Sequence, residues 1–247
     1  MMRPLSSLFL LTLVGNAALL WIGYYWLGLG EAHLSTLLWS LLVALVGCGL
    51  AIELHGATFA YFHQRKDAHV PVAIRTALRH LPALVTVAVL ASAIYYGLSA
   101  WNGYSSTPAF RIASYLTLKL RKPVKPASVL QIFHGVVWLV RWVLVPAILL
   151  PAISLVAGIG WRGFAALKPR GGRHWVLLPI LLLLAFWVPW KLMGWTPRPA
   201  SFALQVMSFG LRFGLAYLLF VAAWLSAAFI ASGGSPRFSQ SKTMVSP

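Results

Sequence analysis

Hydrophobic residues are grouped in long blocks separated by polar and basic stretches, instead of alternating every second residue. Apolar blocks of about 18 residues or more are typical of transmembrane helices, whereas the strands of outer-membrane barrels alternate. We therefore expect an all-α polytopic integral membrane bundle that forms one domain over residues 1–232. The blocks predict six spanning helices, over residues 5–27, 34–62, 81–98, 129–159, 175–195 and 201–232.

A shorter stretch over residues 108–122 has a different, amphipathic pattern. On a helical wheel, the apolar residues share one side and the polar residues share the other: Ile112, Ala113, Leu116 and Leu120 against Arg111, Ser114, Arg121 and Lys122. This arrangement suits a helix that lies in the membrane interface. The alternative is a seventh, short spanning helix, which would place Arg111 in lipid at a considerable cost.

The basic residues of the loops bear on orientation, because cytoplasmic loops of membrane proteins are enriched in Lys and Arg. A six-helix chain with a cytoplasmic N-terminus places somewhat more basic loop residues inside than outside. A seven-helix chain would bring residues 119–125 inside but would move the basic group at 162–173 outside. The side of loop 101–128 therefore stays open.

The excess of basic over acidic residues indicates what the loops contact. The chain has 20 Lys and Arg residues against 3 Asp and Glu, a formal net charge of +17, and 60% of its residues are hydrophobic. The basic residues flank apolar blocks and form no soluble basic domain, so we expect contact with anionic lipid head groups and not with nucleic acid. The style of the chain indicates a bacterial inner (plasma) membrane. The Ser- and Gly-rich tail over 233–247 is expected to be disordered.

One ionisable residue stands out within a predicted span. Glu53 lies on the same face of its helix as Gly49, Gly56 and Ala60, and small residues at such spacing line helix contacts. A carboxylate inside the membrane needs a cationic partner. The possible partners are two arginines near the middle of predicted spans: Arg141, which shares a helix face with His134, and Arg212.

The candidate polar site is therefore Glu53 with Arg141 or Arg212, and His134 beside Arg141. Two interpretations stay open. The pair could fix helix packing as a buried ion pair, or it could form a substrate or relay site.

Missing motifs narrow the function. The sequence has no Gly-rich phosphate loop, no Gly-x-Ser-x-Gly elbow and no His-Glu-x-x-His pair. Three scattered acids cannot form the oxygen cluster that Mg²⁺ requires, and the single cysteine, Cys48, can form neither an internal disulfide nor a cysteine metal site. We expect no cofactor, no metal and no catalytic residue.

These observations favour a multipass inner-membrane component that interacts with lipids, with another membrane protein or with a second copy of itself. An alternative is a small transporter or permease component built around the Glu53 and arginine site. A lesser alternative is a lipid-modifying membrane enzyme.

Overall fold

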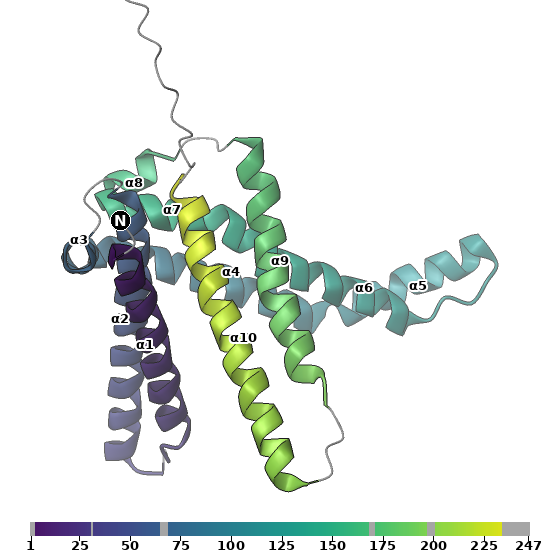
Figure 1. Cartoon of the computed structure of the whole chain (residues 1–247). Coiled ribbons are helices and arrows are strands. Elements are labelled where there is room, and N and C mark those ends of the chain that lie inside the picture. The colour runs from purple at the N-terminus through teal and green to yellow at the C-terminus, as the bar shows by residue number, and fades with distance from the viewer. Residues whose placement is uncertain (1–2, 31, 65–68, 168–170, 197–200, 234–247) are drawn as a thin grey trace, which may run out of the picture.

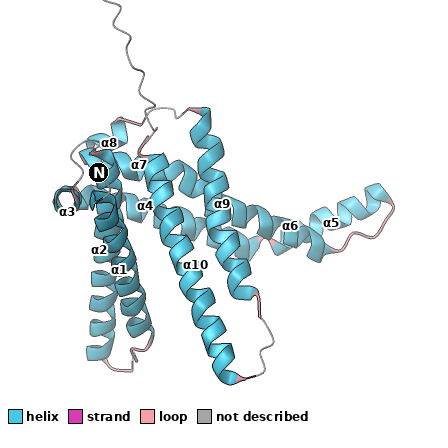
Figure 2. Cartoon of the chain, viewed as in Figure 1, coloured by secondary structure: helices cyan, strands magenta, loops and turns pink. Residues whose placement is uncertain are grey.

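The computed structural model describes residues 3–30, 32–64, 69–167, 171–196 and 201–233, and this part of the chain is built of helices joined by loops (Figures 1 and 2). The elements are α1 (Arg3–Leu27), α2 (Leu34–His63), α3 (Val70–Arg79), α4 (Leu81–Tyr104), α5 (Ser106–Leu120), α6 (Pro126–Leu139), the π-helical turn η1 (Val140–Leu144), α7 (Val145–Ile159), α8 (Arg162–Ala165), α9 (Gly172–Gly194) and α10 (Phe202–Ala231).

Six helices of the described chain are long and apolar enough to cross a membrane, which confirms the predicted all-α multipass fold. They are α1, α2, α4, the continuous helix from α6 through η1 to α7, α9 and α10. The third span continues to Tyr104, six residues beyond its predicted end at 98. Apart from Gly233, the tail over 233–247 lies outside the described residues.

Two helical hairpins, α1–α2 and α9–α10, run in similar directions, and α4 and the α6–α7 helix cross them in this view (Figure 1). The main core lies where α2, α4, α7 and α10 meet. Small buried side chains such as Ala60, Ala157 and Ala228 dominate it. Helices in lipid associate without a hydrophobic driving force, and small residues let their backbones approach closely enough to pack.

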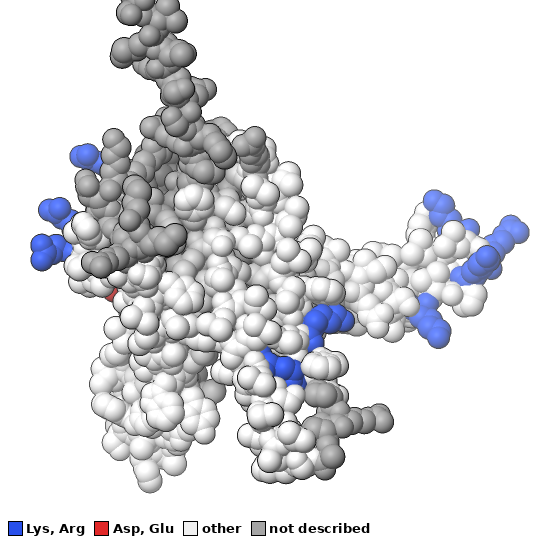
Figure 3. All heavy atoms as spheres, viewed as in Figure 1, with Lys and Arg blue, Asp and Glu red and all other residues white. Residues whose placement is uncertain are grey.

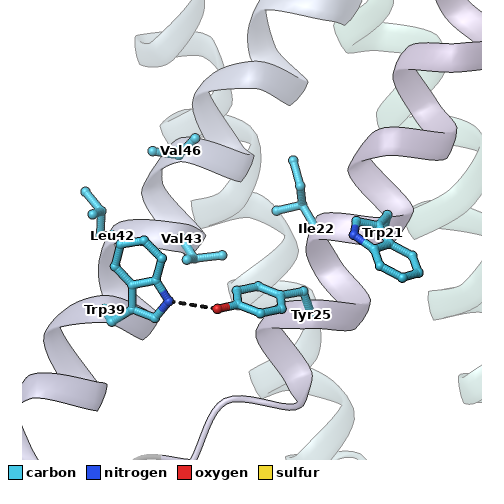
Figure 4. Close-up of a pocket in the computed structure, with 7 residues that line it drawn as sticks. All are labelled: Trp21, Ile22, Tyr25, Trp39, Leu42, Val43 and Val46. Atoms are coloured by element: carbon cyan, nitrogen blue, oxygen red, sulfur yellow. Dashed lines mark hydrogen bonds between the residues drawn. The ribbon is translucent and has the colours of Figure 1, made fainter.

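The α1–α2 hairpin is held in antiparallel register by polar contacts near its loop. Trp39 Nε1 donates to the hydroxyl of Tyr25 at 3.0 Å (Figure 4), and Trp26 Nε1 donates to Ser40 Oγ at 2.9 Å. Tyr25 and Trp39 also line an apolar cavity of about 290 Å³. In the part of the hairpin nearer to α3, Gly15 lies against Leu54 so closely that a Cβ would come within 2.7 Å of it.

The sequence predicts one long helix over 129–159, and the structure widens this helix in the middle. Pro146 has no N–H and its ring would clash with the carbonyl of Trp142, four residues earlier. The helix accommodates it with the π turn η1, whose end is closed by a hydrogen bond from Val145 N–H to the Val140 carbonyl. The chain therefore passes through the proline as a continuous helix.

Two shorter helices lie outside the spans. Residues 70–79 lie between two predicted spans and form α3, which packs on α2 through buried Ala73 and Ala77. The amphipathic segment at 108–122 forms α5, which packs on α6 through Ala109 and Ala113. With α6 it extends away from the body as an arm (Figure 1), and α5 is not among the six long apolar helices.

Candidate functional site

Glu53 lies in a cavity of about 220 Å³ where α1 and α2 face each other. Both carboxylate oxygens are buried, and neither accepts a hydrogen bond from a described residue. All the other residues around the cavity are apolar or glycine: Leu11, Gly15, Ala18, Leu19, Ile22, Leu50, Leu54, Ala57 and Ile74. One acid therefore lies in an apolar cavity in which no described residue supplies a counter-charge.

The helix face that carries Glu53 is covered by other helices along only part of its length. Gly56 and Ala60 are buried, and a Cβ on Gly56 would come within 2.6 Å of Leu84 Cδ1 in α4. A Cβ on Gly49, one turn before Glu53, would meet nothing within 4 Å. Helices α3 and α4 therefore cover the face after Glu53, while the face before it stays uncovered at Gly49.

Arg141 lies on η1, away from the Glu53 cavity. Its guanidinium is 5.7 Å from the centre of the Tyr95 ring of α4 and 5.8 Å from the Trp142 ring. The Trp142 ring in turn lies 4.8 Å from the ring of Phe186 in α9. Cation–π contacts of this kind stabilise a desolvated arginine. Arg141 thus joins α4, η1 and α9 in an aromatic cluster, although its buried Nε has no hydrogen-bond partner.

Arg212 binds the end of the neighbouring helix. Its Nη1 donates to the carbonyl of Trp195 and, at 3.4 Å, to that of Met193, and its Nε donates to the Ser208 carbonyl at 3.2 Å. Because α9 ends at Gly194, two of these carbonyls belong to a helix end that lacks intrahelical donors. A cation there also interacts favourably with the helix dipole. Arg212 therefore caps α9 within the α9–α10 hairpin.

The remaining predicted residue, His134, is exposed on α6. His55, two residues from Glu53, faces the other side of α2, where its ring lies 4.8 Å from that of Trp224 in α10. The structure thus places Glu53 against α1, Arg141 against α4, and Arg212 at the end of α9. It does not bring them together: no residue of η1 or α10 lines the Glu53 cavity.

The α1 residues that line the cavity, and Ile74 of α3, were not predicted from the sequence. For Ile74 the signal was present, because Val70, Ala73, Ile74 and Ala77 have the spacing of one helix face and Pro71 suits a first helical turn.

Comparisons of the chain with protein-family models, with curated proteins and with solved structures find no match. The function must therefore be inferred from the site itself.

Proposed function

We propose that this multipass membrane protein is a partner-binding component of a bacterial inner membrane, in which the Glu53 cavity receives a basic side chain from a transmembrane helix of the partner. The observation that carries the proposal is the pair of buried carboxylate oxygens without a donor. A charge within the bilayer is costly unless it is paired. The two arginines that were candidate partners, Arg141 and Arg212, make other contacts.

The cavity also limits the form of the ligand. A volume of about 220 Å³ admits one long side chain but not a helix, so the partner helix would lie on the outer surface of α1 and α2 and insert a single Lys or Arg. The open face at Gly49 leaves room for it. Exposed Leu45 and Val46 of α2 would add apolar contact.

The same observations favour partner binding over transport. A transporter built on the predicted site would need Glu53 and an arginine along one path. Arg212 is occupied by carbonyls at the end of α9 and Arg141 lies on aromatic rings. These contacts support a packing role for both arginines.

Basic side chains at the edges of the molecule support the lipid part of the proposal. Lys and Arg gather at the far end of the α5–α6 arm and around α3 (Figure 3). We place these groups against anionic head groups, with the N-terminus in the cytoplasm, because basic juxtamembrane segments are attracted to anionic lipid.

The proposal can be tested with model helices in place of the partner. The full-length protein is reconstituted in phosphatidylcholine vesicles with Leu- and Ala-rich transmembrane peptides that carry Lys, Leu or Glu at the depth of Glu53. Association is followed by energy transfer between labels. We expect the Lys helix to bind at least about tenfold more tightly than the Leu helix, a difference of about 1.4 kcal/mol.

Two variants make this test decisive. Glu53→Gln should abolish the preference for Lys, and Leu37→Gln, which adds the same amide to an exposed position on the opposite face of α2, should retain it. Equal binding of the Lys and Leu helices to the wild-type protein would refute partner binding through Glu53. So would a Lys preference that survives in Glu53→Gln. Self-association that Glu53→Gln abolishes would identify a second copy as the partner.

A further inference from the structure

A second cavity lies at a corner of the fold where two spans end. Helix α4 begins at Leu81 and α7 ends at Ile159, and a cavity of about 340 Å³ lies between these two ends. It is lined by residues of the α3–α4 junction and of the α7–α8 turn, among them Arg79, His80, Trp161 and Arg162. The position at the ends of two spans corresponds to the depth of lipid head groups.

The corner is rigidly constructed. His80 Nδ1 donates at 3.0 Å to the carbonyl of Ala157, one of the last carbonyls of α7. Gly160 has a φ of +64°, and a Cβ there would lie 2.8 Å from the His80 ring. A Cβ on Gly163 would come within 2.6 Å of the backbone nitrogen of Val156. These contacts fix the α7–α8 turn against the start of α4, and so fix both sides of the cavity.

No described residue compensates the positive charge at this cavity. Arg79 and Arg162 come from different elements and are both exposed. Neither forms a hydrogen bond or an ion pair with a described residue, and none of the residues that line the cavity is acidic. Two guanidinium groups beside one cavity repel each other, and a bound anion removes that repulsion. The planar guanidinium is also the group best suited to bind phosphate oxygens in pairs.

The rest of the lining indicates a lipid as the source of the phosphate. Pro82, Ala83 and Ile159 give the cavity an apolar side that a free inorganic ion would not use. Trp161 is 59% exposed and stacks on Phe164 at 5.9 Å, and exposed tryptophan at a helix end is typical of the membrane interface.

We infer that this corner, which we call the Arg79–Arg162 site, binds the phosphate of an anionic phospholipid head group. Arg79 and Arg162 hold the phosphate oxygens, and Trp161 and the apolar side contact the glycerol region. The inference gives the general attraction to anionic lipid a defined site, and it does not depend on the partner proposed for Glu53.

The experiment measures phospholipid binding to the full-length protein in mild detergent by native mass spectrometry. Phosphatidylglycerol and phosphatidylcholine are titrated onto the wild-type protein and onto Arg79→Gln/Arg162→Gln. The matched control is Arg75→Gln/Arg111→Gln, which loses the same charge from exposed positions outside this cavity. We expect the site variant to bind phosphatidylglycerol about tenfold more weakly, and the control to change less than about twofold.

Each other outcome contradicts the inference. Equal losses in the two double variants would show general electrostatic attraction without a site. Equal affinity of the wild-type protein for the two lipids would remove the requirement for an anionic head group. Competition by millimolar inorganic phosphate, to the same extent as by the lipid, would assign the site to free phosphate.

Two further variants guard against misfolding and against confusion with the Glu53 cavity. Arg79→Lys/Arg162→Lys keeps both charges and is expected to retain most of the phosphatidylglycerol binding. If it binds as weakly as the Gln variant while its melting temperature is unchanged, the guanidinium geometry is required. Both arginine double variants could lose binding and also melt below the wild-type protein, while the Arg75→Gln/Arg111→Gln control melts with it. The loss would then follow unfolding, and the site would be refuted. Glu53→Gln should leave lipid binding unchanged.

Discussion

His174 Nε2 donates a hydrogen bond of 3.3 Å to the backbone carbonyl of Ala147, and both groups are buried. Ala147 is four residues before Pro151 in α7. Because proline has no N–H, it cannot donate to that carbonyl, which would be left without a partner inside the membrane. A side chain from α9 therefore supplies the hydrogen bond that the α7 backbone cannot make.

This relationship predicts a thermodynamic coupling between the two helices. His174→Ala should lower the free energy of unfolding by about 1 kcal/mol, since it leaves a buried acceptor unpaired. The same substitution should cost less in a Pro151→Ala background, where an N–H at position 151 can reach the Ala147 carbonyl. A double-mutant cycle by thermal unfolding in detergent measures the coupling. Strictly additive effects would show that the hydrogen bond contributes nothing.

Removing the cap at the end of α9 should weaken the α9–α10 hairpin. Arg212→Met keeps the length of the side chain but leaves the carbonyls of Met193 and Trp195 without their donor. We expect a loss of about 1–2 kcal/mol in the free energy of unfolding. Arg75→Met, at an exposed position of α3, should change stability by less than about 0.5 kcal/mol. Equal melting temperatures for the two variants would contradict the capping role.

The α7–α8 corner should not tolerate a side chain at Gly160. Its positive φ, with ψ at −140°, is a region almost exclusive to glycine, and the His80 ring occupies the space of a Cβ. Gly160→Ala should therefore destabilise the protein by about 2–3 kcal/mol. Gly135→Ala in α6, where a Cβ meets nothing within 4 Å, should raise stability by about 0.5–1 kcal/mol. The denaturation midpoints of Gly160→Ala and Gly135→Ala, each compared with the wild-type protein, test both expectations.

Access of water to Glu53 can be tested with thiols. Cys48 is exposed on α2, and Gly49 has space for a side chain. In intact vesicles a charged, membrane-impermeant thiol reagent should label neither Cys48 nor Gly49→Cys. It should readily label Lys122→Cys, at the exposed end of the α5–α6 arm, when added to the side on which the arm lies. Labelling of Gly49→Cys at the rate of the arm position would support a hydrated transport path.

The spans could be predicted because a long apolar block has one stable structure in lipid, a helix whose backbone hydrogen bonds are all internal. The face of Glu53 could be predicted too, since helical periodicity places it with Gly56 and Ala60. The neighbouring helix could not. A wheel gives the direction of a side chain from its own axis, but whether α1 or an arginine-bearing helix lies there depends on how the hairpins pack.

The partners of the arginines could not be predicted from the sequence either. The sequence places Arg212 within a span and so suggests an ionic partner, but backbone carbonyls at a helix end can satisfy it equally well. That outcome depends on the register of α9 against α10. Helix α3 was missed for a different reason, because its ten residues are too short for a span and its polar face resembles a loop.

The π turn at η1 preserves the facing of the fourth span on both sides of Pro146. It takes about one residue more per turn than the α-helix around it, whereas one extra residue in a regular α-helix would rotate everything beyond it by about 100°. Because the wider turn absorbs that residue, Ser154, which meets Ser232 at the end of α10 at 2.8 Å, and the Ala147 carbonyl keep facing their partners. A one-residue deletion within Val140–Leu144 would remove the wider turn and force the ring of Pro146 against the carbonyl four residues before it. The segment is thus constrained by its proline, and not by the thickness of the bilayer.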